Sequence, residues 1–439
     1  MSQELEEKKK SEEQLDKKPE KKKKEKKEKT NLAYFMRKRM LTVLVVIFIF
    51  LYSGYNMVTQ FDVFKENVET SVDNIWDKKS DMKTEIAVLD ASMTSDMKER
   101  MKFVEIFSYV QKVLGKREIN NFKFVKDETG SLHYSSFYKD ISVNNYFEYA
   151  LRVKRLSDYA KEQGTDVLFV VAPSKFVTDD NRLKTGLPVN DPQAIVDETL
   201  FYLNRLGVDT LDLNQYIPNE KVTYEDSFFR TDHHWTIPAA FNATKILANT
   251  LNEEYGYGLD VDYYLADENF ETVQYKQGML GSMGRATGVN YSGLDDFTAI
   301  YPLYHADINR KCLEENGSYS EYKGDLIGTV IRPDQLTGGS LYERTQYGLY
   351  LDGLRPYEQV INYSNPDGKK IFMIRDSYFS PVISFMTPMC NEIDAMWSLE
   401  ESDEINIEEY IRANKFDCII VEIYPYNINE DAFQYFMEE

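Results

Sequence analysis

Hydrophobic residues follow two spacings in the larger, C-terminal part of the chain. From about residue 118, short continuous apolar runs alternate with segments in which apolar residues recur every three or four positions. The runs are typical of buried parallel strands and lie at 166–175, 208–213, 369–376 and 416–424. The recurring pattern is typical of amphipathic helices and lies at 145–163, 194–206, 238–251 and 405–414. This alternation predicts an α/β fold, a parallel sheet with helices on both faces, in which ligands bind at the carboxyl ends of the strands.

The longest apolar run, residues 40–61, contains no charged side chain. As a helix it would be roughly 33 Å long, which is enough to cross the hydrocarbon core of a membrane. Arg37, Lys38 and Arg39 directly precede it, so the positive-inside rule places the N-terminus in the cytoplasm and the rest outside. A cleaved signal peptide and a buried core helix are the alternatives. The length of the run and its apolar residues on every face favour an uncleaved, single-pass anchor in the cell membrane.

The segments on either side of this run differ from it in composition. Residues 1–39 are rich in Lys and Glu, which predicts a disordered cytoplasmic tail. Residues 62–115 alternate charged and apolar positions at helical spacing, which predicts a helical stalk. Residues 116–439 form the predicted α/β domain. Its part at about 256–365 is rich in Gly, Tyr and turn dipeptides and is expected to be an irregular insertion with short strands.

Charge is divided unevenly along the chain. The 439 residues include 52 Lys and Arg and 73 Asp and Glu, for a net charge of −21. Residues 1–40 nevertheless carry 15 basic and 9 acidic side chains, a net charge of +6, so the remainder has a net charge of −27. This acidic part would repel the phosphates of nucleic acid. The three cysteines form no CxxC pair, which excludes a disulfide framework and cysteine zinc sites.

The segment 230–236 contains two of the four histidines and lies on a predicted loop between a strand and a helix. If it is extended, Asp232 and His234 share one face and His233 points away. A carboxylate beside an imidazole fixes its tautomer and favours its charged form, which is the orienting half of a hydrolytic triad. Trp235 is expected to form a wall of such a site.

A candidate nucleophile follows another predicted strand. Ser377 lies at the turn between this strand and a helix, where its hydroxyl would be exposed at the carboxyl edge of the sheet. His234 would accept the Ser377 proton, and Asp232 would hold His234. The free N–H groups of Ser377 and Tyr378 at the helix N-terminus would form part of an oxyanion hole, and Gly353 is a candidate for a further donor.

Other interpretations of these residues remain open. A lone Asp-x-His is often structural, and a strand that ends in Asp-Ser before a helix is often an N-cap. Asp232, His233 and His234 are also a candidate metal site. Adjacent histidines diverge on an extended chain, however, and few other histidines exist, so we expect no metal.

The motifs together resemble a known family. The run Asp232-His233-His234-Trp235-Thr236, followed by Asp376-Ser377-Tyr378, is similar to the bacterial DHHW family, which is related to the alginate O-acetylation proteins AlgJ and AlgX and to SGNH-type hydrolases. The segment 281–288 also resembles that family's Gly-Ser-rich segment. The resemblance covers residues 110–439 and implies an SGNH-like fold in which Asp232, His234 and Ser377 form the triad. Arg375 departs from the SGNH pattern, in which a glycine precedes Asp-Ser.

This resemblance implies a function. We expect a membrane-anchored, extracytoplasmic O-acetyltransferase that modifies a cell-surface or secreted polysaccharide through an acyl-serine, without a cofactor. A polytopic membrane O-acyltransferase would deliver the acetyl groups. Trp235, Arg285 and Lys175 are candidate substrate contacts, and Arg285 and Lys175 could equally have structural partners. The alternatives are a carbohydrate esterase (deacetylase) with the same triad, and a non-catalytic glycan-binding or assembly protein.

Overall fold

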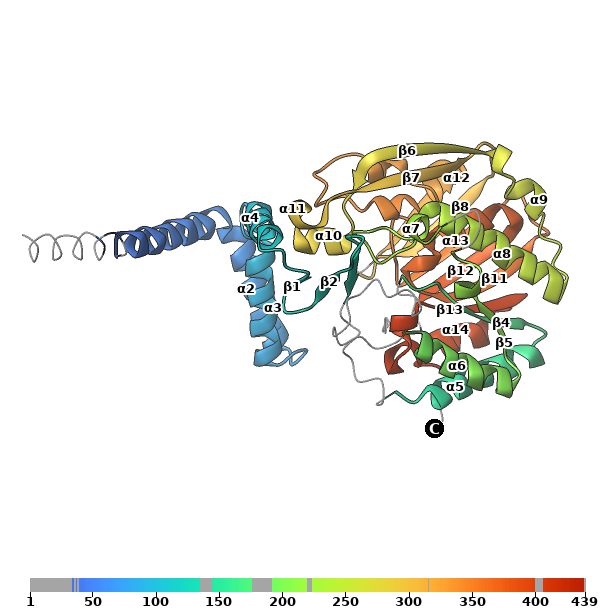
Figure 1. Ribbon diagram of the computed structural model, residues 1–439. Helices are drawn as coiled ribbons and strands as arrows, with labels where there is room; N and C mark the ends of the chain where they lie inside the picture. Colours follow the sequence, from blue (N-terminus) through green and yellow to red (C-terminus); the bar gives the residue numbers. More distant parts are fainter. Residues whose placement is uncertain are drawn as a thin grey trace, which may run out of the picture. The chain divides into compact units, whose positions relative to one another are not determined.

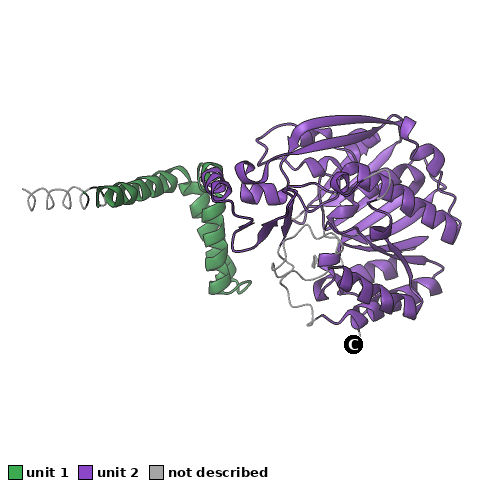
Figure 2. Cartoon of the chain, viewed as in Figure 1, with its two compact units in different colours: residues 1–102 green, residues 103–439 purple. Residues whose placement is uncertain are grey.

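The chain forms two compact units, residues 1–102 and 103–439, which Figure 2 shows in different colours. The computed structural model describes residues 34, 37, 39–134, 144–175, 192–218, 223–314, 316–398 and 406–437. The tail predicted for residues 1–39 lies outside the described residues apart from positions 34, 37 and 39.

The first unit is helical. Residues Arg39–Thr59 form one helix that is long and apolar enough to cross a membrane, and its most apolar stretch is not buried within the protein. Two further helices, α2 (Phe61–Trp76) and α3 (Met82–Ser95), pack against each other. Asp81 caps α3, because its Oδ1 accepts a hydrogen bond from the Thr84 amide at 2.8 Å. Helix α4 (Arg100–Val113) contains the boundary between the two units.

The second unit is built on an eight-stranded sheet with the order β5-β4-β13-β11-β12-β10-β8-β9 (Figure 1). The first five strands in this order are parallel. They are β4 (Asp166–Val171), β5 (Asp209–Asp212), β11 (Lys369–Arg375), β12 (Cys390–Trp397) and β13 (Cys418–Ile423). Except for β12, each lies within an apolar run that predicted a strand. The predicted α/β fold is therefore confirmed.

Three antiparallel strands extend this sheet, so the sheet is mixed. They are β8 (Ile308–Leu313), β9 (Tyr319–Gly324) and β10 (Tyr357–Asn362). All three come from the segment at 256–365 that was expected to be an irregular insertion with short strands. Polar residues within them kept the hydrophobic pattern from giving their bounds: Arg310 in β8 and Glu358 in β10 have no exposed surface and form an ion pair at 3.0 Å. Charged side chains are buried in this way only when they are paired.

Helices cover both faces of the sheet (Figure 1). One layer contains α5 (Tyr146–Glu162), α6 (Pro192–Leu206) and α14 (Ile407–Ala413), and the other contains α8 (Ile237–Tyr255) and α13 (Ser380–Met386). Successive residues of β11 alternate between the two cores: Ile371 and Met373 belong to the core with α8 and α13, and Phe372 and Ile374 belong to the other. The sheet is thus buried on both faces, and its carboxyl edge is left for a site.

Smaller elements complete this unit. They are β1 (Glu118–Ile119), β2 (Phe124–Lys126), β3 (Leu132–Tyr134), the ribbon of β6 (Phe270–Met279) and β7 (Asp295–Pro302), and the short helices α7 (Tyr224–Ser227), α9 (Val261–Tyr264), α10 (Ser282–Thr287), α11 (Val289–Ser292) and α12 (Leu326–Thr329). Several of them contact the segment 230–236, among them β3 and α10. The Leu132 amide of β3 donates to the Arg230 carbonyl at 2.8 Å, and the Gly284 amide of α10 donates to the Thr231 carbonyl at 2.8 Å.

Candidate active site

The segment 230–236 is a bent loop between α7 and α8, and both of its ends are fixed. The Thr236 amide donates to the Ser227 carbonyl at 2.8 Å, which brings the two ends of the loop together. Thr236 also caps α8, because its Oγ1 accepts a hydrogen bond from the Ala239 amide at 3.4 Å. This cap therefore fixes the point at which the loop enters the helix.

Lys175 ties the same loop to its neighbours. The side chain is buried, and Nζ donates to the carbonyl oxygens of Leu132, Arg230 and Asp232 at 2.7, 3.1 and 2.9 Å. Burial lowers the pKa of Lys175 from 10.5 to about 8. All three protons of the ammonium group are used inside the protein, so these contacts support the structural role that the sequence left open for Lys175.

Ser377 lies at the carboxyl end of β11, two residues after the strand ends. The Asp376 carboxylate closes the turn, since Oδ1 accepts from the Tyr378 amide at 2.9 Å and Oδ2 accepts from the Tyr424 amide at 2.8 Å. A 3₁₀ turn, η7 (Ser377–Phe379), then leads into α13. This cap places the Ser377 hydroxyl at the edge of the sheet that the 230–236 loop also occupies.

Asp232, His234 and Ser377 form one continuous chain of hydrogen bonds. Nδ1 of His234 lies 2.6 Å from Oδ1 of Asp232, and Nε2 of His234 lies 2.7 Å from Oγ of Ser377. Burial alone would raise the pKa of Asp232, but His234, His233 and the hydrogen bonds that the carboxylate accepts hold this pKa well below 3.8. The ionised carboxylate keeps a proton on Nδ1 of His234, which leaves Nε2 able to accept the serine proton.

The second oxygen of Asp232 is held by the Gly-Ser-rich segment. The Ser282 amide donates to Oδ2 of Asp232 at 2.6 Å. Gly281 approaches so closely that a Cβ at this position would lie 2.4 Å from Cβ of Asp232 and 2.5 Å from the Thr231 carbonyl oxygen. Family resemblance alone had drawn attention to this segment, and no role was predicted for it. Its glycine permits the contact that completes the hydrogen bonding of the carboxylate.

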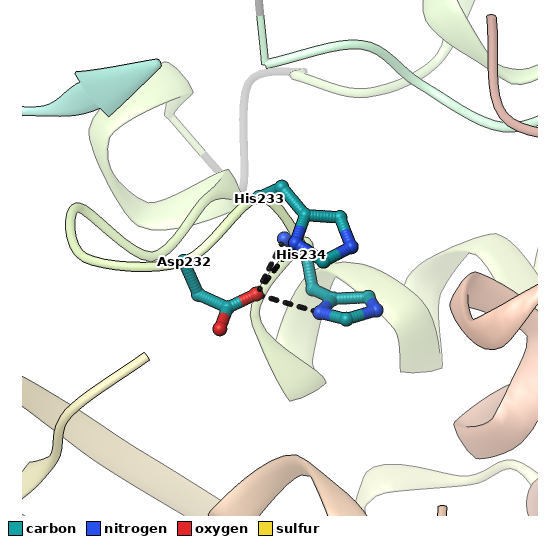
Figure 3. A group of neighbouring side chains, drawn as sticks. All are labelled: Asp232, His233 and His234. Atoms are coloured by element: carbon teal, nitrogen blue, oxygen red, sulfur yellow. Dashed lines mark hydrogen bonds and ion pairs between the residues drawn. The ribbon is translucent and has the colours of Figure 1, made fainter. Parts of the chain in front are cut away.

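His233 does not point away from His234, as an extended chain had predicted. The two ring centroids are 3.9 Å apart with 36° between the ring planes, and Nδ1 of each ring faces Oδ1 of Asp232 (Figure 3). Residues 230–234 bend, so the alternation of an extended strand does not apply to them. Burial and the neighbouring His234 lower the pKa of His233 to about 3, which keeps its imidazole neutral.

The same three residues are close enough to bind a metal ion. One ligand atom from each of Asp232, His233 and His234 lies within 4.8 Å of the others. Both Nε2 atoms, however, point away from the carboxylate, and Oδ1 is already an acceptor for Nδ1 of His234 (Figure 3). One ion could not reach the carboxylate and both Nε2 atoms as they lie. The donor arrangement therefore favours hydrogen bonding to a serine over metal binding.

Aromatic residues pack against the His234 imidazole and support it. Tyr347 stacks on its imidazole with ring centroids 4.0 Å apart and 18° between the planes. Trp235 donates from Nε1 to Oη of Tyr347 at 2.9 Å and to the Tyr378 carbonyl at 3.1 Å. Trp235 has no exposed surface, so it supports the site from the core and does not form the predicted wall. Sequence reasoning missed Tyr347, because nothing in the surrounding TQYGLY distinguishes it from the other tyrosines.

The predicted oxyanion donors differ in availability. The Ser377 amide has no hydrogen-bond partner among the described residues, whereas the Tyr378 amide is occupied by Asp376. Gly353 lies in the left-handed region with φ +97°, and within the described part of the chain no hydrogen bond links it to Ser377. The Ser377 amide is therefore the donor that this geometry offers to an oxyanion.

Arg285, the remaining predicted substrate contact, lies near the end of α10. Its Nη1 donates to the carbonyl oxygens of Leu280 and Arg344 at 3.2 and 3.1 Å. These bonds connect α10 to the segment that precedes Tyr347, and part of the guanidinium group is used for them. The structural role that the sequence left open for Arg285 is thus the one that these contacts support.

Comparison with known proteins points to one family. The family described as "SGNH hydrolase-like domain, acetyltransferase AlgX" matches residues 136–378, more than half of the chain, and this span contains Asp232, His234 and Ser377. The chain is 25% identical over 233 residues to the alginate biosynthesis protein AlgX of Pseudomonas syringae and 28% identical over 204 residues to that of Azotobacter vinelandii. The matches cover 49% and 45% of this chain but 43% and 38% of those proteins, less than half of their length.

A solved structure shows the same fold. Bacillus cereus PatB1 superimposes with a TM-score of 0.57 and 17% identity, and the match covers 71% of this chain and 99% of that protein. The resemblance to alginate O-acetylation proteins and the SGNH-like fold, both predicted from the sequence, are confirmed. The chain belongs to the family of SGNH hydrolase-like acetyltransferase domains that includes AlgX.

Proposed function

We propose that this protein is a membrane-anchored, extracytoplasmic O-acetyltransferase that modifies a polysaccharide. Ser377 is the nucleophile, His234 is the general base and acid, and Asp232 orients His234. The observation that carries the proposal is the unbroken hydrogen-bond chain through these three residues in a member of an acetyltransferase family. The two relatives, both alginate biosynthesis proteins, support a polysaccharide as the acceptor.

In the first half-reaction, Nε2 of His234 takes the Oγ proton while Oγ of Ser377 bonds to the carbonyl carbon of the acetyl donor. The carbonyl electron pair moves to the oxygen, and the Ser377 amide donates a hydrogen bond to this oxyanion. The carbonyl then re-forms as the bond to the leaving group breaks, and the leaving group receives the proton from His234. The products are acetyl-Ser377 and the protonated leaving group.

In the second half-reaction, a sugar hydroxyl gives its proton to Nε2 of His234 and attacks the acetyl-serine carbonyl. Collapse of the second oxyanion releases the sugar ester, and Ser377 regains its proton from His234. Asp232 stays ionised throughout and stabilises the imidazolium that forms in each step, because its pKa is held well below 3.8.

The apolar helix Arg39–Thr59 supports a membrane anchor, and the basic residues before it favour an N-terminus in the cytoplasm. This topology places the site outside the cell. An anchored enzyme stays close to the membrane surface, which suits a polytopic membrane O-acyltransferase as the source of acetyl groups.

The test uses the full chain in detergent with a chromogenic acetyl ester as donor and an oligosaccharide as acceptor. Wild type is expected to form acetyl-Ser377 and acetylated sugar, both detected by mass spectrometry. Ser377→Ala is expected to reduce chromophore release by a factor of at least about 10³, by analogy with other serine triads. Ser318→Ala, an exposed serine between β8 and β9, is the matched control and should retain full activity.

The outcomes separate the alternatives. Acetylated sugar supports the transferase, whereas free acetate without labelled sugar identifies an esterase with the same triad. Equal activity of wild type and Ser377→Ala would contradict the role of Ser377. Oligosaccharide binding without acetyl-Ser377 in the wild type would identify a non-catalytic glycan-binding protein.

A further inference from the structure

The two neighbouring imidazoles of the 230–236 loop suggest how an acceptor is chosen. We propose that His233 is a specificity-determining residue: its Nε2 accepts a hydrogen bond from the hydroxyl next to the one that becomes acetylated. The acceptor is accordingly a vicinal diol, that is, a sugar with free hydroxyls on adjacent carbons. This inference rests on the acetyl transfer proposed for Ser377.

The orientation of the two rings is the first observation. Oδ1 of Asp232 lies 2.6 Å from Nδ1 of His234 and 3.3 Å from Nδ1 of His233, so the Nδ1 atoms of both rings face one oxygen. Figure 3 shows that both Nε2 atoms consequently point away from the carboxylate in the same direction. Because Nε2 of His234 contacts Oγ of Ser377, Nε2 of His233 faces the side on which the acceptor must arrive.

The protonation of His233 is the second observation. Its pKa is lowered to about 3 by burial and by His234, so the ring is neutral under ordinary conditions. Nδ1 lies 3.3 Å from Oδ1 of Asp232 and 3.3 Å from Oγ of Ser282, and the carboxylate favours the proton on Nδ1. Nε2 is therefore an acceptor, and no hydrogen bond within the described part of the chain uses it. Such a partly buried acceptor calls for a donor.

The surroundings of His233 favour a small polar group as that donor. The rings of Tyr134 and Tyr424 lie 5.6 and 6.2 Å from the imidazole, centroid to centroid. His233 and these two tyrosines also line a cavity of about 10 Å³, together with His133, Lys175, Met283 and Tyr426. This volume is that of a single water-sized group, which a hydroxyl matches and a larger substituent does not.

The spacing of the two rings indicates that the acceptor is a vicinal diol. With centroids 3.9 Å apart, the imidazoles present two acceptor nitrogens side by side. Hydroxyls on adjacent ring carbons are close enough for each to meet one nitrogen at an ordinary hydrogen-bond length. The hydroxyl at His234 loses its proton and attacks, while its neighbour donates to His233 and stays intact. His233 thus positions the acceptor without taking part in proton transfer.

The first test measures which acceptor takes the acetyl group from the enzyme. A chromogenic acetyl ester is the donor, and cis-1,2-cyclohexanediol and cis-1,3-cyclohexanediol are the acceptors, so both offer two hydroxyls. One additional hydrogen bond predicts an approximately tenfold preference of the wild type for the 1,2-diol. His233→Phe keeps an aromatic ring without the nitrogen and should abolish this preference. His233→Gln keeps an acceptor and should restore part of it.

The burst of chromophore release reports acetylation of Ser377 separately. Because His233 also faces Asp232, a smaller burst in a His233 variant reports the loss of that contact, whereas the ratio of 1,2- to 1,3-diol transfer within each variant reports the contact with the acceptor. An unchanged preference in His233→Phe would overturn the inference. Transfer to both diols that falls in parallel with the burst, at an unchanged ratio, would do so too, since His233 would then act only through Asp232.

A second measurement does not depend on acetyl transfer. The chain has only four histidines, so ¹⁵N-histidine labelling gives a simple spectrum, and His233→Gln assigns the His233 signals. The 1,2-diol should shift the Nε2 signal of His233, and the 1,3-diol should leave it in place. If wild type forms no acetyl-Ser377, the proposed function fails, whereas an Nε2 signal that the 1,2-diol leaves in place refutes the role of His233.

Discussion

Gly281→Ala tests whether the position of the Asp232 carboxylate controls the activity. The added methyl group would lie 2.4 Å from Cβ of Asp232, 2.5 Å from the Thr231 carbonyl oxygen and 2.6 Å from Oδ2 of Asp232. Gly281 has φ −68° and ψ 175°, which an alanine adopts without strain. The effect is therefore purely steric, and it acts on the residue that orients His234.

The size of the effect follows from these distances. Ordinary carbon contacts are about 3.5 Å or longer, so the loop must move by roughly 1 Å to admit the methyl group. A displacement of this size in an orienting group typically reduces turnover by about 100-fold. Overpacking of this kind costs about 1–3 kcal/mol in the free energy of unfolding. The loss of activity should thus be far larger than the loss of folded protein.

The assay compares kcat/KM for a chromogenic acetyl ester with the midpoint of urea unfolding. Ile393→Val, a buried change in β12 that costs about 0.5–1.5 kcal/mol, is the matched control for lost stability and should keep full activity. The reasoning is refuted if Gly281→Ala remains within about twofold of wild type, or if Ile393→Val loses as much activity.

Two further substitutions test the supports of the site. Lys175→Met removes the donor to three buried carbonyl groups and should lower the free energy of unfolding by about 2–4 kcal/mol; an unchanged urea midpoint would contradict this. Burial, together with the nearby Asp376 carboxylate, raises the pKa of Glu422 well above 4.5. The folded protein therefore keeps the Glu422 carboxyl protonated above about pH 4.5, where the unfolded chain releases this proton. Wild type therefore loses stability as pH rises above that value, and the melting temperature of Glu422→Gln relative to wild type should increase from pH 4.5 to 8. A constant difference would show that Glu422 is ionised in the folded protein.

The sequence predicted those elements whose burial is apolar. Four parallel strands and the helices α5, α6, α8 and α14 follow from continuous or periodic hydrophobic runs. Strand β12 was not predicted, because Glu392 and Asp394 interrupt its apolar residues. Lys370 pairs with Glu392 at 2.6 Å, and burial raises the pKa of Asp394 to about 7. The hydrophobicity of a segment does not show that its charged side chains can be buried, because the groups that surround them come from other parts of the chain.

The site divides in a similar way. The spacing of Asp232 and His234 on a loop, and the position of Ser377 just after a strand, were enough to predict that these side chains meet. The structure places all three within hydrogen-bond distance. The orientation of His233 could not be predicted, since it depends on a bend that tertiary contacts impose. Tyr347 was missed for the same reason, because its segment meets His234 only after the sheet has formed.

Arg375 shows how a buried charge can replace a glycine. Its side chain has no exposed surface, and Nη1 donates to the Asp376 carbonyl at 3.2 Å and to Oγ of Ser380 at 3.1 Å. These bonds connect the residue before Ser377 to a residue after it and so stabilise the turn. The turn therefore does not need the close backbone approach that a glycine allows.

The guanidinium group of Arg375 also donates to Glu358 in β10, and Arg310 in β8 pairs with the other oxygen of Glu358. Without Glu358, the arginine below Ser377 would be a buried, unpaired charge, which costs several kcal/mol. The antiparallel strands that the hydrophobic pattern did not predict therefore supply the counter-charge for the serine turn. The arginine that departs from the Gly-Asp-Ser pattern and the antiparallel part of the mixed sheet are thus connected by one buried ion-pair network.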